Sequence, residues 1–222
     1  MKSTGNDIIA LNAIDIQRTN TPAFYSKIIN AAEQALYRGP GVSTLPFPVF
    51  IWLLWSIKES VYKYLKRTDA KLVFSPTKII IQNIVVPGNA PVTGLTNSVW
   101  ENGQSEEGFF TGGVKFKEYQ LYFRSKIDEA FIASVVNPAP GFDNIYWGVK
   151  KIDNPCQENQ SKQAREFVLQ KLKLLLSADD LRIEKTPAGC PIVLKGGEQL
   201  TIPVSLSHHD HFVAYSFLLE AV

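Results

Sequence analysis

The sequence has little cysteine and little net charge, and each shortage excludes a class of protein. Two cysteines, Cys156 and Cys190, occur among 222 residues and form no C-x-x-C pair. We therefore expect no disulfide framework. The formal net charge is only +2, which lacks the strong basic excess typical of nucleic-acid-binding proteins. No nucleic-acid partner is expected, although local basic patches for phosphates remain compatible with this composition.

Long apolar segments are also missing. The most apolar stretch, residues 45–55, contains Pro46 and Pro48 and is too short to span a bilayer. The N-terminus lacks the basic and then apolar order of a signal peptide. With 45% hydrophobic and 20% charged residues, the composition is that of an ordinary globular protein. We expect a cytoplasmic protein with no membrane partner, and a monomer.

Residues 47–66 are predicted to form one helix. The segment 55–63 contains neither glycine nor proline and follows the apolar stretch. Apolar side chains recur at helical spacing along one side, namely Leu54, Ile57, Val61 and Leu65. Trp55, Glu59 and Lys63 follow one another at steps of four on roughly the opposite side.

Two interpretations of Glu59 and Lys63 are open. A solvent-exposed pair of this kind contributes only about 0.2–0.5 kcal/mol to helix stability. Trp55 on the same side instead indicates that this side is covered, so that the pair lines a cleft between parts of the molecule. The charge pattern alone favours the exposed pair.

The Ile-rich segment 7–16 is predicted to be a buried strand. Asp15 within it either caps the following turn or meets a cation, because a buried carboxylate without a partner is costly.

A helix is expected from Thr21-Pro22 to Gly39. Further strands are predicted at residues 78–86, 114–123 and 129–136, and irregular chain at 87–113 and 137–160. From Ser161 a helical period returns, followed by strands at residues 181–184, 191–194, 201–206 and 211–219. The fold class is therefore α+β.

Several motifs together resemble the 4′-phosphopantetheinyl transferase superfamily. The string W-x-x-K-E-x-x-x-K at residues 55–63 resembles the signature of its large, surfactin-synthetase-activating type. The string A-I-D-I at residues 13–16 is similar to the family's G-I/V-D-I/V, with Ala13 in place of the glycine. The string S-L-S-H at residues 205–208 is similar to the family's S/N-L/I-S/T-H. The helix before residue 39 also carries Glu33 where the family has a glutamate.

The order of these motifs implies a circular permutation. In the large enzymes the segment with the S-x-S-H motif comes first, whereas here it comes last. The resemblance implies two similar halves, residues 1–150 and 156–222, each with a helix on a small antiparallel sheet. The site would lie between the halves, with His208 facing Glu59 across it. The start of the first strand would lie near the end of the last.

The resemblance also implies an activity. Such enzymes transfer the phosphopantetheine group of coenzyme A to a serine of an acyl or peptidyl carrier protein, in fatty-acid, polyketide or nonribosomal peptide synthesis. Asp15 and Glu59 would hold Mg²⁺, and Glu59 would accept the serine proton. Lys63 would bind the pyrophosphate, while Ser207 and His208 would hold the phosphates of coenzyme A.

Some residues depart from the family pattern. Gln17 stands where the large enzymes often carry a second acid, and Cys190 replaces a phosphate-binding lysine. An alternative is therefore an inactive family member that binds coenzyme A or a carrier protein without transfer. A third option is an α+β structural protein whose matches to the motifs are coincidental. Separately, the cluster of His208, His209, Asp210 and His211 could be a zinc site, although strand alternation allows only two of the imidazoles to share a side. A solvated turn is the simpler interpretation of that cluster.

Overall fold

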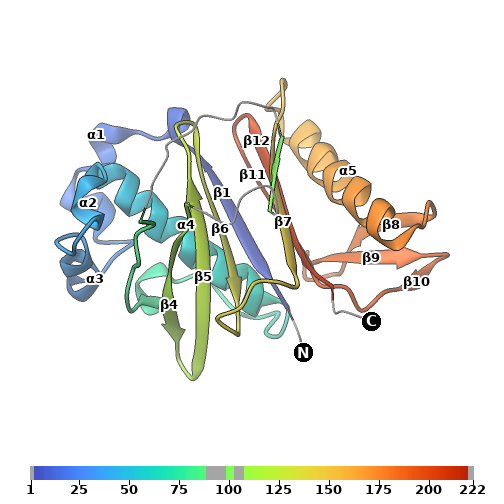
Figure 1. The fold of residues 1–222 in the computed structure, drawn as a ribbon, viewed down its shortest axis with the longest axis horizontal. Helices are drawn as coiled ribbons and strands as arrows, with labels where there is room; N and C mark the ends of the chain where they lie inside the picture. The colour runs from blue at the N-terminus through green and yellow to red at the C-terminus, as the bar shows by residue number, and fades with distance from the viewer. Residues whose placement is uncertain (1–2, 89–98, 103–107, 220–222) are drawn as a thin grey trace.

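A computed structural model describes residues 3–88, 99–102 and 108–219. Within them the strands form two larger antiparallel sheets and one small one (Figure 1). The first sheet has the order β1-β6-β5-β4-β2, with β1 at Gly5–Ala10, β2 at Ile80–Ile81, β4 at Phe110–Phe116, β5 at Tyr119–Ile127 and β6 at Phe131–Asn137. The second has the order β11-β12-β7-β3, with β3 at Val99–Glu101, β7 at Ile145–Lys151, β11 at Val204–His209 and β12 at Phe212–Leu218. The third joins β8 at Leu181–Lys185, β9 at Pro191–Lys195 and β10 at Glu198–Gln199.

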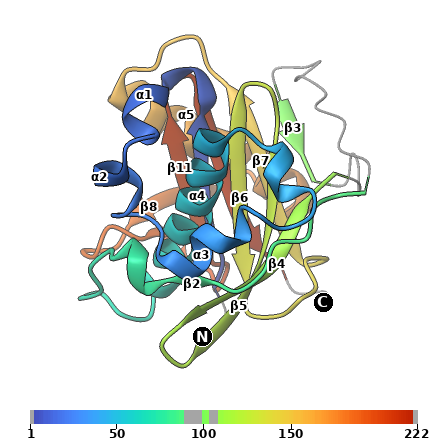
Figure 2. The same cartoon turned by 90° about the vertical axis from the view of Figure 1, so that its left-hand side faces the viewer.

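Two long helices cover the outer faces of the two larger sheets. Helix α4 (Phe47–Lys66) packs on the first sheet and α5 (Gln157–Leu176) packs on the second (Figure 1). The short helices α1 (Ile16–Thr19), α2 (Pro22–Tyr25) and α3 (Ala31–Leu36) lie on the outer side of α4 (Figure 2). Short 3₁₀ turns are found at η1 (Leu11–Ala13), η2 (Val42–Thr44) and η3 (Pro76–Lys78). The predicted α+β class is confirmed.

Apolar side chains fill three layers between these elements. One layer lies between α4 and the first sheet, a second between the two sheets, and a third between the second sheet and α5. The stripe predicted on α4 belongs to the first layer, where Leu54, Ile57 and Val61 are fully buried. Among the described residues, no helix is long and apolar enough to cross a membrane.

The predicted elements agree with the structure best where the pattern is longest. Helix α4 has the predicted bounds, whereas β1 ends at Ala10, so the strand predicted to continue to residue 16 is wrong. The single helix expected after Pro22 is two short helices. The connector expected at 137–160 contains β7, which pairs with β12 and β3 and so belongs to the second sheet. Trp55 packs on Phe74 from the segment after α4 and not on the second sheet, which corrects the covering expected for it.

A buried ion pair between Glu33 and Lys58 joins α3 to α4. The Lys58 Nζ donates to Glu33 Oε2 at 2.7 Å and to the Ile28 carbonyl at 2.7 Å. Glu33 also accepts from the Ile81 N–H at 2.9 Å and forms a capping box with Asn30. Both charged side chains are fully buried. Burial lowers the pKa of Lys58, although the Glu33 carboxylate acts to raise it. The glutamate that the sequence marked in this helix is therefore part of the core.

We expect Glu33→Gln to lower the free energy of unfolding by about 3–5 kcal/mol, because it leaves a buried ammonium without its counter-charge. Urea denaturation measures the change. Glu166→Gln is the matched control, since Glu166 pairs with Lys162 at 3.9 Å in an exposed position, and its effect should stay within about 0.5 kcal/mol. Equal effects for the two variants would contradict a charged pair in the core.

Candidate functional site

A close contact between β1 and α4 determines where Asp7, the charged residue of β1, lies. A Cβ atom added to Gly5 would lie 2.0 Å from the Ser60 carbonyl oxygen and 2.7 Å from the Tyr64 nitrogen. Only glycine therefore allows the strand to come this close to the helix. Because side chains two residues apart share a face of a strand, Asp7 also points toward α4.

Asp7 meets the two charged residues of the signature. The Lys63 Nζ lies 2.9 Å from Asp7 Oδ1 and 3.4 Å from Glu59 Oε1. The side chain of Asp7 is 6% exposed, whereas those of Lys63 and Glu59 are 23% and 29% exposed. Glu59 and Lys63 are therefore not a solvated pair on a helix surface. They form the open side of a three-residue cluster that has Asp7 at its base.

This cluster has more negative than positive charge. Burial, with a further contribution from the Glu59 carboxylate, raises the pKa of Asp7 to about 7, although Lys63 acts to lower it. Burial alone would lower the pKa of Lys63, but Asp7 and Glu59 hold it above its usual value. One ammonium thus faces two carboxylates, and the cluster attracts either a proton or a second cation.

A divalent cation fits this arrangement. Asp7 Oδ2 is buried and has no hydrogen-bond partner among the described residues. Carboxylate oxygens are the ligands that Mg²⁺ prefers, and it commonly binds through one or two of them. Asp7 and Glu59 supply two such groups, so the residues present suit a hard divalent cation.

His208 belongs to β11, which lies beside β1, the strand that carries Asp7. Burial and then the positive charges of Lys63 and Lys185 lower its pKa, while Glu59 acts to raise it. The side chain of His208 is exposed. Ser207 is different: its hydroxyl is buried and accepts a hydrogen bond from Asn6 Nδ2 at 2.8 Å.

Asp15 is placed elsewhere than expected. It is exposed and is the N-cap of α1, where its carboxylate accepts from the Arg18 N–H at 2.9 Å. No contact among the described residues links it to Glu59 or Lys63. The turn-capping interpretation of Asp15 is the one the structure has. Gln17 lies in α1, so it does not share a strand face with Asp15.

Asp7 was missed, although the sequence contains a signal for it. Residues 5–8 read G-N-D-I, which keeps the glycine and aspartate spacing of G-I/V-D-I/V and differs at Asn6. The string around Asp15 keeps both apolar positions but lacks the glycine. The close contact of Gly5 with α4 explains why the glycine identifies the site better than the apolar positions of the motif do.

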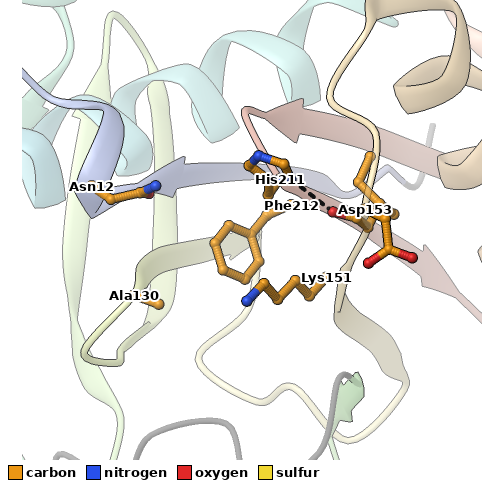
Figure 3. A pocket seen from close by; sticks show the side chains of 7 residues that line it. Asn12, Ala130, Lys151, Asp153, His211 and Phe212 are labelled. Atoms are coloured by element: carbon orange, nitrogen blue, oxygen red, sulfur yellow. Dashed lines mark hydrogen bonds between the residues drawn. The ribbon is translucent and has the colours of Figure 1, made fainter.

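The remaining histidines have separate roles. His209 Nδ1 accepts from the Ala10 N–H at 2.8 Å. His211 Nδ1 lies 2.9 Å from the Ile152 carbonyl and lines a cavity of about 330 Å³ with Asn12, Lys151 and Phe212 (Figure 3). In the part of the chain that the structure describes, no group of three or more His, Cys, Asp or Glu residues could hold a metal ion. The zinc alternative has no support there.

Comparison with known proteins gave one finding. The family model of the 4′-phosphopantetheinyl transferase superfamily matches residues 3–108. This segment is thus similar to a superfamily of transferases, and it contains Asp7, Glu59 and Lys63 but not Ser207 or His208. No curated protein and no solved structure matches the chain.

The raised pKa of Asp7 predicts an unusual pH dependence of stability. Its pKa is near 7 in the folded chain and ordinarily 3.8, so the folded state binds the extra proton between these values. The contribution of protonated Asp7 to stability is complete below pH 3.8 and is lost as the pH rises through about 7.

In the metal-free protein we therefore expect Asp7→Asn to gain stability relative to the wild type between about pH 5 and about pH 8. The gain should exceed about 1.4 kcal/mol, the equivalent of one pKa unit. Chemical denaturation at the two pH values measures it, and Asp143→Asn at an exposed position is the control. A wild type that becomes more stable than Asp7→Asn over this interval would contradict the assigned direction.

Proposed function

We propose that the chain transfers the 4′-phosphopantetheine group of coenzyme A to a serine of an acyl or peptidyl carrier protein. The observation that carries the proposal is the cluster of Asp7, Glu59 and Lys63, which lies within the segment similar to a transferase superfamily. The cluster offers what the reaction needs, namely carboxylates for a hard cation, a base, and an ammonium for phosphate oxygens.

Asp7 and Glu59 are the residues that would hold Mg²⁺, which would neutralise phosphate oxygens when bound. This replaces Asp15 by Asp7 in the proposed site. Glu59 is the more exposed of the two carboxylates and would accept the proton of the carrier serine. Lys63, fully charged between the carboxylates, would bind the pyrophosphate and stabilise the negative charge of the leaving group.

The proposed reaction is a single displacement. The serine oxygen forms a bond to the phosphorus that carries the pantetheine arm. The bond from this phosphorus to the bridging oxygen breaks, and that oxygen leaves with 3′,5′-ADP. The serine proton passes to Glu59. A neutral His208 would donate a hydrogen bond to the phosphates from the other side.

We also infer that the chain is a permuted form of the large type of this superfamily. Each larger sheet carries its own twenty-residue helix, as two related halves would. The start of β1 lies at the end of β12, because the Thr4 and Ser216 hydroxyls are 3.1 Å apart. An ancestral chain that ran from the second half into the first would have passed through this point.

Transfer is tested by mass spectrometry of several apo-carrier proteins incubated with coenzyme A and Mg²⁺. We expect Glu59→Gln to reduce the rate by about 10²–10⁴-fold, the usual contribution of a general base. Asp7→Asn and Lys63→Met should also abolish measurable transfer. Asp15→Asn is the matched control and should retain activity, because Asp15 caps a helix on the surface.

Two outcomes would count against the proposal. Full activity of Asp7→Asn, or an equal loss in Asp15→Asn, would contradict the site. Tight binding of coenzyme A by the wild type, without modification of any carrier protein, would instead favour the inactive binding protein.

A further inference from the structure

β1 and β11 are edge strands of different sheets that lie side by side (Figure 1). Among the described residues, no backbone hydrogen bond joins the outward N–H groups of β1 to β11. Instead the Asn6 N–H donates to Ser205 Oγ at 3.1 Å, and the Ala10 N–H donates to His209 Nδ1 at 2.8 Å. The sequence separation is the same in both bonds, so the strands run parallel and in fixed register.

A row of alternate side chains on β11 makes these contacts. Ser205, Ser207 and His209 all point toward β1, and Ser207 accepts from the side chain of Asn6 at 2.8 Å. His208 stands between them in sequence and points the other way, since neighbours on a strand alternate. The two serines are buried, whereas His208 is exposed.

This row acts as a spacer. Two edge strands with free N–H and C=O groups would otherwise pair directly at the usual strand spacing of about 4.8 Å. Side chains inserted between them accept from the N–H groups of Asn6 and Ala10 and keep the two backbones apart. On its other face β1 holds Asp7 against Lys63. The spacing between β1 and β11 therefore sets the position of His208 relative to the cluster of Asp7, Glu59 and Lys63.

We propose that the Asn6 contact with Ser205 and Ser207 is a positioning device, which fixes His208 relative to Glu59 and Lys63. Ser207 then acts through Asn6 and does not bind a ligand. The inference deepens the proposed function by assigning roles to Asn6 and Ser207, but its geometry is a property of the ligand-free chain and can be tested without any transfer assay.

His208 reports on this geometry through its ionisation. The charged and titratable groups that act on it are Lys63 on α4, Lys185 on β8, His209 on β11 and Glu59 on α4. Burial is the largest cause of its lowered pKa, followed by Lys63. The ring of His208 is exposed but still partly covered, and a loosened contact between β1 and β11 would uncover the remainder and move the ring away from Lys63. Both changes raise the pKa toward its usual value.

The experiment is an NMR pH titration of the histidines in the ligand-free full chain. The three histidines can be assigned by single substitutions. We expect Ser207→Ala and Asn6→Ala each to raise the titration midpoint of His208, and Ser207→Thr, which keeps the hydroxyl, to restore it. His211, bonded to Ile152, should not move. Lys63→Met alone should raise the titration midpoint of His208. The same substitution made together with Ser207→Ala should raise the midpoint by less than it does alone.

Ser125→Ala is the matched control, because Ser125 is a buried serine bonded to Ser134 within the first sheet. It should leave the His208 midpoint unchanged. If Ser207→Ala does not fold, Ser205→Ala tests the same contact. An unchanged His208 midpoint in folded Ser207→Ala or Ser205→Ala and in Asn6→Ala would overturn the positioning role. Absence of transfer activity would leave this result untouched and would bear only on the proposed function.

Discussion

The close approach of β1 to α4 is the constraint on which the site depends. Gly5 lets the strand touch the Ser60 carbonyl, and this contact brings Asp7 to Lys63. β1 is then held on its remaining sides by the backbone ladder with β6 and by the side chains of β11. A strand held in three directions can keep the Asp7 carboxylate buried near that of Glu59. If the strand could move, the repulsion between the two carboxylates would push them apart.

Helix α4 carries two kinds of charged contact one residue apart, and the contrast separates structure from function. Lys58 has both a counter-charge and a carbonyl, and its partner Glu33 is satisfied by two backbone N–H groups. The Asp7 cluster keeps a buried oxygen that has no partner among the residues that the structure describes, and it has an excess of negative charge. Incomplete satisfaction of this kind is rare in a purely structural core and often marks a functional site.

Sequence reasoning succeeded where one local pattern decided the outcome. The uninterrupted period of α4 fixed its bounds and placed Glu59 beside Lys63. Asp7 was missed because the local signal around it, G-N-D-I, is imperfect at Asn6, and because its contact is with Lys63, more than fifty positions away in the sequence. Asp15 was expected on a strand because it stands between two isoleucines, whereas β1 ends at Ala10 and η1 follows it. The ligand role expected of Ser207 came from the S-x-S-H resemblance, and its bond to Asn6 could not be foreseen because that bond joins two strands far apart in sequence.

We propose that Asp7, and not Asp15, completes the site with Glu59 and Lys63. A crystal structure with coenzyme A and Mn²⁺ tests it most directly, because Mn²⁺ takes the same oxygen ligands as Mg²⁺ and is located by its anomalous scattering. We expect the ion at Asp7 Oδ2 and Glu59, with the pyrophosphate against Lys63. An ion at Asp15, or a pyrophosphate bound away from Lys63, would contradict it.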